Sequence, residues 1–395
     1  MGIKDLLSQL SKRYKEHGLK HENVFLEKFA GHSFAIDVSI YAHTFMAVSR
    51  KEAVKYINVL REDPNHAIMR SYWLERYFDM MVALLECNIT PIAVFDGPHF
   101  ELKQKTKEER SDRYQARTDE IKKLREELQQ NDDPTKLANL RRKLEHHITF
   151  QKDDWVLLEE MFRTMGIPVV KPDTEAEAVC ARLVQRGYAT AVVTKDGDAL
   201  AHLSPFMISK ITRSYRQSKP WHTCTVYVLD EITQALELSR SQFVDFCMLL
   251  GTDYNERIRG YGFVNALKFL KQGGDLDTTL EIIRKRVETY NAKQVKAEKL
   301  DRVIDLDSYR LFDPDVRCQI RDYFTKPLNV KVEHFPVVLY ENGLQSFVAD
   351  TFMGPNRERL LGQIPQKIEL LKSFNQLYAQ AQIFVLQPKT EDNGK

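Results

Sequence analysis

The chain has 395 residues, 43% of them hydrophobic and 29% charged, and its formal net charge is only +2. This composition is typical of a soluble globular protein, and the length allows two or three structural units. A near-neutral chain has no overall charge that forces a nucleic-acid partner. Any DNA-binding surface must therefore gather its basic residues on one face.

The five cysteines are far apart and never form a C-x-x-C pair. We therefore expect neither a disulfide framework nor a zinc site, and we expect a reducing compartment. No run of apolar residues has the length of a membrane span, and the first residues lack the core of a signal peptide. The sequence predicts a soluble, intracellular protein with no membrane partner.

Short apolar runs alternate with helical patterns in the first half of the chain. Helices are predicted at residues 67–87 and 175–187, and strands at residues 33–37, 91–96, 168–170, 190–194 and 206–210. This alternation indicates an α/β fold with a largely parallel sheet covered on both faces. Ligands of such folds bind at the carboxyl ends of the strands. Asp37, Asp96 and Asp196 stand at that end of three predicted strands.

The segment 101–152 is nearly all charged or polar and strongly helix-forming, with a break predicted at Asn131–Pro134. Its apolar periodicity is weak, and its acids nearly match its bases in number. One interpretation is a solvated helical hairpin stabilised by ion pairs four residues apart. The other is a helical arch over an active site that handles a polyanion. The sequence leaves both open, and from about residue 229 onward it predicts only helices.

Each acidic group in the chain has a structural explanation when taken alone. Asp196 or Asp198 can cap a helix that follows the strand, and this is the simpler interpretation of that pair. Thr174 and Glu177 fit a capping box around Glu175. Asp253 can be an ordinary polar residue at a helix end, although an acid there opposes the helix dipole.

The acids become harder to explain as a set, because they are predicted to converge on one end of one sheet. Clustered carboxylates raise each other's pKa and need countercharge to stay ionised. Hard divalent cations supply that charge, and carboxylates with water suit Mg²⁺ or Mn²⁺. Two such ions about 4 Å apart can activate a water and stabilise the leaving oxygen of a phosphodiester. The Asp196 and Asp198 pair is therefore best interpreted as metal ligands.

In chain order, the sequence contains the stretches MGIKDLL, FAIDVSIY, VFDGPHFELK, DTEAEAVCA, TKDGDAL and LLGTDYNERIRGYG. Their order resembles that of the flap endonuclease/XPG family of structure-specific 5′ nucleases. The resemblance covers roughly residues 1–275 and continues faintly through LFDPDV at 311–316.

The resemblance implies an α/β fold with a PIN-like nuclease core built on a mostly parallel sheet. It also implies a helical arch, a helix–two-turn–helix element that grips duplex DNA, and a helical C-terminal region. We expect four segments: the first part of the core at 1–100, the arch at 101–152, the second part of the core with the helix–two-turn–helix at 153–275, and the C-terminal helical region with a short polar tail at 276–395.

The resemblance further implies an active site with two Mg²⁺ ions, for which Mn²⁺ can substitute. The residues at the family's acidic positions are Asp37, Asp96, Glu175, Glu177, Asp196, Asp198 and Asp253. Lys103 and Arg110 stand where the family keeps basic residues that contact the scissile phosphate, and they are counted with the catalytic residues. Without the resemblance, a solvated helix face would be the simpler interpretation of both.

Other positions are implied to contact DNA. Gly2 matches the small residue that the family places near its active site, and either Tyr41 or His43 matches an aromatic residue that stacks on DNA. Further contacts are expected from the basic residues Arg50, Arg141, Arg142, Arg257, Arg259 and Lys268.

The turn of the implied helix–two-turn–helix keeps Gly260 and Gly262, whose backbone amides can approach a phosphate closely. It is also a candidate site for a monovalent cation. Phe263 and Val264 replace the family's usual proline and basic residue, which predicts a weaker or altered grip on the duplex.

The sequence thus predicts a Mg²⁺-dependent phosphodiesterase that acts on branched DNA in replication, repair or recombination. It would be a 5′-flap endonuclease, a 5′→3′ exonuclease or a junction-cutting enzyme, monomeric and located in the nucleus or another compartment of DNA replication. The alternatives are a catalytically dead DNA-binding scaffold and a PIN-type ribonuclease. The stretch QSFVADTF at 345–352 loosely resembles a sliding-clamp peptide, but its spacing favours a core helix.

Overall fold

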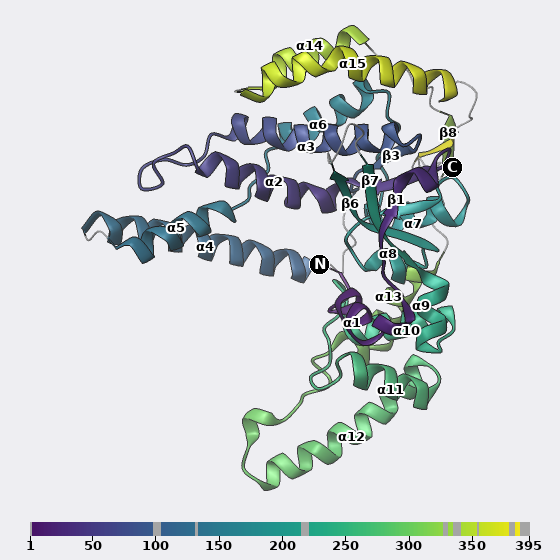
Figure 1. The fold of residues 1–395 in the computed structure, drawn as a ribbon. Helices are drawn as coiled ribbons and strands as arrows, with labels where there is room; N and C mark the ends of the chain where they lie inside the picture. The colour runs from purple at the N-terminus through teal and green to yellow at the C-terminus, as the bar shows by residue number, and fades with distance from the viewer. Residues whose placement is uncertain are drawn as a thin grey trace, which may run out of the picture. The chain divides into compact units, whose positions relative to one another are not determined.

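The computed structural model describes residues 2–97, 104–130, 133–214, 221–326, 331–334, 341–353, 355–378 and 384–387 (Figure 1). The chain divides into two compact units. Unit 1 comprises Met1–Val24, Glu177–Thr212 and Thr223–Asn329, and unit 2 comprises Phe25–Ala176, Arg213–His222 and Val330–Lys395. The four-segment division made from the sequence stays a prediction.

Unit 2 contains three adjacent parallel strands, β2 (Ser33–Asp37), β3 (Thr90–Val94) and β4 (Val169–Val170). The helices packed around them are α2 (Val38–Val54), α3 (His66–Glu86) and α6 (Lys152–Thr164). Large aromatic side chains fill the core: Tyr77 of α3 lies 5.3 Å from the Trp73 ring and 5.8 Å from the Phe162 ring. These strands and α3 confirm the alternation predicted from the sequence.

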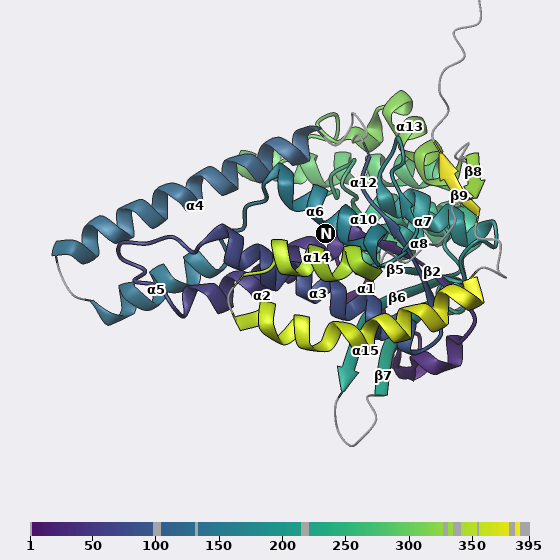
Figure 2. The same ribbon diagram turned by 90° about the horizontal axis from the view of Figure 1, so that it is seen from above.

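The polar segment of unit 2 folds as two helices, α4 (Gln104–Gln130) and α5 (Pro134–Glu145), with Asp133 capping α5. The helices lie side by side in both views (Figures 1 and 2). They share a small apolar core made of Ile121, Leu128, Leu140 and Leu144 together with Val54 and Val59.

Ion pairs in this hairpin join the two helices. Lys136 contacts Glu127 at 2.6 Å, and Lys143 contacts Glu120. The hairpin of the first interpretation is present, and the ion pairs described in it join its two helices. Apolar residues at the correct three- and four-residue spacing are present, but the many charged residues around them hide the pattern.

The last part of unit 2 packs on α3. It consists of α14 (Glu341–Thr351), α15 (Pro355–Tyr378) and a two-stranded antiparallel sheet of β8 (Lys331–His334) and β9 (Phe384–Gln387). Phe347, Val348 and Phe352 are buried, which supports the core-helix interpretation of 345–352. The expectation of helices alone after residue 229 is wrong, because β8 pairs with a strand that follows about fifty residues later, and local periodicity carries no sign of such pairing.

Unit 1 contains strands in the order β1 (His21–Phe25), β7 (Trp221–Val228), β6 (Phe206–Ser214) and β5 (Ala191–Val193), and β5 and β6 are parallel. The sequence predicted β5 and β6 but neither β1 nor β7. The helices are α1 (Leu6–Arg13), α7 (Ala176–Gln185), α8 (Asp198–Ala201), α9 (Leu229–Leu236), α10 (Arg240–Leu250), α11 (Phe263–Gly273), α12 (Leu276–Lys296) and α13 (Pro314–Thr325). Short 3-10 turns of unit 1 occur at Lys15–His17, Leu300–Arg302 and Arg310–Phe312, and Leu26–Phe29 forms one in unit 2.

None of the helices in the described parts of the chain is long and apolar enough to cross a membrane.

Candidate active site

Two acids of unit 2 lie at the carboxyl ends of neighbouring strands. Asp37 ends β2 and caps α2, since its Oδ1 accepts a hydrogen bond from the Ile40 N–H at 3.2 Å. Asp96 follows β3, and its Oδ1 accepts from the N–H of Ala176, the first residue of α7, at 3.0 Å. Because β2 and β3 are parallel and paired, both carboxylates stand at the same edge of the sheet.

Burial and the negative charge at this edge raise the pKa of two tyrosines, Tyr41 and Tyr77. The Tyr77 hydroxyl donates to the Val38 carbonyl at 2.5 Å, and its pKa is raised by burial and then by the charges of Asp37, Tyr41 and Asp96. Burial and the Asp37 charge also raise the pKa of Tyr41. Both phenols therefore stay neutral. The charges of Asp37 and Asp96 both reach the Tyr77 hydroxyl and, after burial, contribute to its raised pKa.

Gly97 explains why the strand end can approach the loop that carries Glu175. A Cβ atom on Gly97 would lie 2.0 Å from the Pro172 carbonyl oxygen, and the Gly97 N–H donates to the Thr174 carbonyl at 2.9 Å. Glu175 is only 1% exposed. The capping-box alternative needs correction here, because α7 begins at Ala176 and the Asp96 carboxylate accepts from its first N–H.

In unit 1, Asp196 and Asp198 follow β5 and lie at the start of the short helix α8. The Asp196 Oδ1 accepts from the Asp198 N–H at 3.1 Å, which is the local, cap-like bond of the simpler interpretation. Asp198 is 1% exposed, and its Oδ1 accepts from the N–H of Ile3 at 2.8 Å. The N-terminal segment is therefore seated on this acidic pair.

Gly2 allows the N-terminal segment to pack this closely against Asp196 and Asp198. Its φ is +71°, and a Cβ atom built on it would lie 1.6 Å from the Asp196 Oδ1 and 2.6 Å from the Asp198 Oδ1. No other residue fits there, because the two carboxylate oxygens occupy the space that a Cβ would fill. The structure thus places Gly2 at the acids, as the sequence suggested, while its contact with DNA remains a prediction.

Arg257 connects the same N-terminal segment to the end of α10. Its guanidinium donates to the Leu250 carbonyl at 2.7 Å, to the Lys4 carbonyl at 2.7 Å and to the Asp5 carboxylate at 2.9 Å. These bonds use three of the five N–H donors of the guanidinium, and the expected phosphate contact of Arg257 stays a prediction. Sequence spacing could not show these bonds, since Lys4 and Asp5 lie some 250 residues away.

The remaining two acids also belong to unit 1. Glu177 lies in the first turn of α7 and is 7% exposed. Asp253 is half-buried in the loop after α10, which ends at Leu250, so it does not stand in the helix. Thr252 fixes this loop, because its hydroxyl bonds the Asn255 side chain at 2.7 Å.

The donor atoms of the seven acids are all oxygen, the ligand type that Mg²⁺ and Mn²⁺ prefer. Unit 2 supplies Asp37, Asp96 and Glu175, and unit 1 supplies Glu177, Asp196, Asp198 and Asp253. Within the described residues, no three His, Cys, Asp or Glu side chains form a ready-made metal cage. Strand ends, helix starts and, for Asp253, the loop after α10 position these acids.

The predicted basic residues differ in what the structure shows. Lys103 lies outside the described residues. Arg110 falls in α4, and its side chain is also outside them. Arg50 is 4% exposed and donates to the Leu144 carbonyl at the end of α5. We therefore assign Arg50 to packing rather than to DNA contact, whereas Arg141 and Arg142 are exposed on α5.

The two aromatic candidates for stacking on DNA are also separated by the structure. Tyr41 is 3% exposed, and its ring lies 5.6 Å from that of Phe45. His43 is exposed and contacts Phe150 edge-on at 5.1 Å. Of the two, His43 is the one that presents its ring to solvent.

The glycine turn precedes α11. Gly260 is exposed with a φ of +87°, which favours glycine, and Gly262 caps the helix. Phe263, which departs from the family pattern, packs its ring 5.1 Å from Phe246 in the core of unit 1, and Val264 is 50% exposed. The Arg259 side chain is exposed, as a phosphate contact requires.

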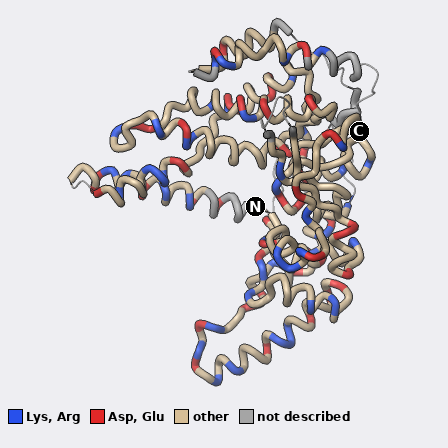
Figure 3. The backbone as a smooth tube through the Cα atoms, viewed as in Figure 1, with Lys and Arg blue, Asp and Glu red and all other residues tan. Residues whose placement is uncertain are grey.

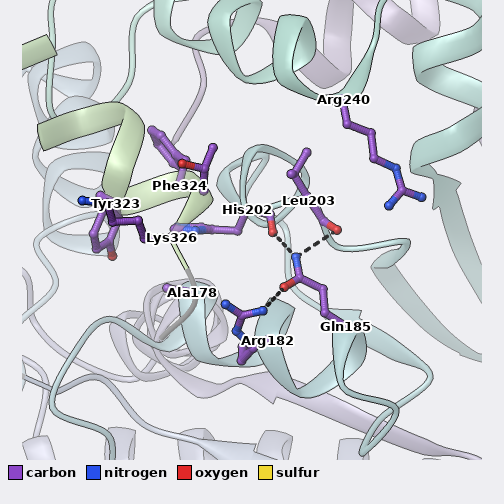
Figure 4. Close-up of a pocket in the computed structure, with 10 residues that line it drawn as sticks. Ala178, Arg182, Gln185, His202, Leu203, Arg240, Tyr323, Phe324 and Lys326 are labelled. Atoms are coloured by element: carbon purple, nitrogen blue, oxygen red, sulfur yellow. Dashed lines mark hydrogen bonds between the residues drawn. The ribbon is translucent and has the colours of Figure 1, made fainter. Parts of the chain in front are cut away.

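A pocket of about 260 Å³ in unit 1 reveals supporting residues that sequence reasoning missed (Figure 4). The Gln185 amide donates to the His202 carbonyl at 2.6 Å and accepts from Arg182 at 2.9 Å. His202 directly follows α8, whose first residue is Asp198. The network therefore holds the far end of the helix that carries Asp198.

Comparison with known proteins decides the family. The XPG N-terminal domain model matches residues 1–117, and the XPG I-region model matches residues 166–253. Flap endonuclease 1 of Saccharomyces cerevisiae (strain ATCC 204508 / S288c) is 32% identical over 287 residues, which is 72% of this chain and 68% of that protein. The chain belongs to the flap endonuclease/XPG family.

Further comparisons agree with this assignment. Flap endonuclease 1 of Entamoeba dispar is 29% identical over 316 residues, 79% of each chain. The catalytic core of Rad2 in complex with DNA substrate has a TM-score of 0.60 at 21% identity and covers 93% of this chain and 99% of that one. The junction-resolving enzyme GEN1 with product DNA and Mg²⁺ has a TM-score of 0.51 at 18% identity, covering 93% and 80%.

These structures share the PIN-like nuclease fold, so the fold predicted from the sequence is confirmed. As a member of the flap endonuclease/XPG family, the chain is a metal-dependent, structure-specific 5′ nuclease of DNA.

Proposed function

We propose that the chain is a Mg²⁺-dependent 5′ nuclease that cuts branched DNA, as a 5′-flap endonuclease and as a 5′→3′ exonuclease. The observation that carries this proposal is the pair of Asp196 and Asp198, whose Oδ1 atoms lie 1.6 and 2.6 Å from the position that a Cβ of residue 2 would take. Like charges held this close repel each other, and divalent cations with oxygen ligands offset that repulsion. The Mg²⁺ found with GEN1 supports the choice of ion.

We assign two Mg²⁺ ions to the seven acids named above, and Mn²⁺ suits the same oxygen ligands. When bound, two such ions activate a water and stabilise the leaving oxygen of a phosphodiester. The chain's own contribution is to hold its carboxylates in place. The Ile3 N–H fixes the Asp198 carboxylate, and the Ala176 N–H fixes that of Asp96.

Lys103 and Arg110 are assigned to the scissile phosphate. A cation placed there stabilises charge that develops in the transition state, so it affects the rate of cleavage more than the affinity for DNA. Arg110→Ala is expected to slow single-turnover cleavage by about tenfold or more and to change the dissociation constant of the flap substrate little.

We propose that duplex DNA binds at the glycine turn, formed by Gly260 and Gly262, and at the neighbouring residues Arg259 and Lys268. Backbone amides at a helix start can bind a phosphate, and the turn also suits a monovalent cation. Exposed Arg141, Arg142 and His43 are assigned to the rest of the DNA. The protein acts as a monomer. It works in the compartment where DNA is replicated or repaired. Residues 345–352 serve as core packing rather than as a sliding-clamp peptide.

The substrate preference is tested with one preparation and five labelled DNAs: a 5′ flap, a nick, a blunt duplex, a four-way junction and single-stranded RNA. The proposal predicts the highest single-turnover rate on the 5′ flap, with cleavage near the branch, and slower removal of nucleotides from the nick. Preferred cutting of the junction or of the RNA would contradict it.

A further inference from the structure

Helix α12 has an apolar face along its first half only. Leu276, Leu280, Ile283 and Val287 are buried there. Every residue from 288 to 296 is exposed or half-buried, although Asn291 bonds the backbone of Ile304 at 2.8 and 2.9 Å, so this half of the helix contributes little to the core of unit 1. Figure 1 shows this end of α12 pointing away from α11.

Three exposed lysines follow the side of α12 opposite that apolar face. With about 100° between successive residues, Lys296 lies within about 20° of Lys285 around the helix, and Lys293 within about 80°. The apolar residues are centred about 180° from Lys285. Figure 3 shows basic residues along the length of this helix. We call Lys285, Lys293 and Lys296 the lysine stripe.

Arg286 shows which side of α12 borders the glycine turn. Its guanidinium lies 4.8 Å from the centre of the Phe269 ring of α11, and that ring lies 5.5 Å from the ring of Tyr261, the residue between the two turn glycines. Lys293 stands seven residues further on, about two helical turns, and therefore on nearly the same side. The lysine stripe thus continues outward from the glycine turn.

The acids of the exposed half do not interrupt this stripe. Glu281 and Glu288 lie beside it, about 40–60° from Lys285 on the side away from Arg286. Arg284, which pairs with Asp307, lies beyond these acids. The three lysines therefore lie between the acids and the side that borders the turn.

We propose that the lysine stripe is a second contact for the backbone of duplex DNA, continuing the grip of the glycine turn. This rests on the proposed binding of duplex at that turn. Lys285 and Lys296 are eleven residues apart, about 16 Å along the helix, which is the axial length of about five base pairs. Affinity should therefore rise as the duplex arm becomes long enough to reach the stripe.

The test uses the full chain with Lys285→Gln, Lys293→Gln and Lys296→Gln combined. Dissociation constants are measured in chelator on flap substrates whose duplex arm is shortened stepwise. On the longest arm the variant should bind about tenfold more weakly, and the slope of log affinity against log salt should fall by about 2–3, since each lost phosphate contact removes about 0.9. On the shortest arm it should match the unmodified protein.

The matched control removes three cations of unit 1 that already have acidic partners, by Lys20→Gln, Arg240→Gln and Lys271→Gln. It has the same net charge as the test variant and should bind like the unmodified protein. Equal weakening by both variants, or equal weakening on the shortest arm, would overturn the proposal. Failure of the unmodified protein to bind any branched DNA would instead contradict the proposed function.

Discussion

The main-chain N–H of Ile3 donates to the carboxylate of Asp198 at 2.8 Å, across 195 residues of sequence. This bond fixes one of the proposed metal ligands to the start of the chain. Because a Cβ on residue 2 would overlap the carboxylates of Asp196 and Asp198, the geometry of the acidic pair depends on a glycine that has no side chain of its own.

Gly2→Ala should therefore damage catalysis. The new methyl group would overlap the Asp196 carboxylate, so we expect single-turnover cleavage to fall by about tenfold or more while DNA affinity changes little. Gly18→Ala is the matched control, because Gly18 also has a positive φ of +65° but its Cβ would meet nothing within 4 Å. If both variants cut equally fast, Gly2 has no role in placing the acids.

Arg257→Ala should loosen the N-terminal segment rather than weaken the hold on DNA. Losing charged hydrogen bonds to Lys4 and Asp5 should lower the free energy of unfolding by about 1–3 kcal/mol. Hydrogen exchange at the Ile3 amide, measured without metal, should become faster. Arg259→Ala should leave both quantities unchanged and reduce the salt slope of DNA binding by about 1. If Arg257→Ala instead reduced the salt slope and left the free energy of unfolding unchanged, Arg257 would be a phosphate contact.

The sequence predicted the strands that end in acids because apolar runs and terminal aspartates are local patterns. It also predicted the helix break near Pro134. It missed the Arg257 bonds and the buried position of Arg50, because both depend on partners far along the chain. The strands β1 and β7 escaped detection because His21–Phe25 and Trp221–Val228 mix polar and apolar residues without a clear run. Non-local pairing decides their structure.

Asp198→Asn tests whether the acidic pair is electrostatically strained without metal. The asparagine oxygen can still accept from Ile3, while one negative charge next to Asp196 is removed. Thermal unfolding in chelator should show unchanged or slightly higher stability. A loss of about 1 kcal/mol would instead point to a role for the charge in stabilising the start of α8.

The most direct test of the central claim, that the acids act through divalent metal, is a Mg²⁺ titration of single-turnover flap cleavage. The unmodified protein should be inactive in excess chelator and regain activity as Mg²⁺ is added. Asp196→Ala should cut at least about a hundredfold more slowly at saturating Mg²⁺, yet bind the flap with nearly the same dissociation constant. Asp230→Ala, which removes an exposed acid of unit 1 paired with Arg240, serves as the control and should cut normally. Full cleavage in excess chelator, or an unimpaired Asp196→Ala variant, would contradict the account.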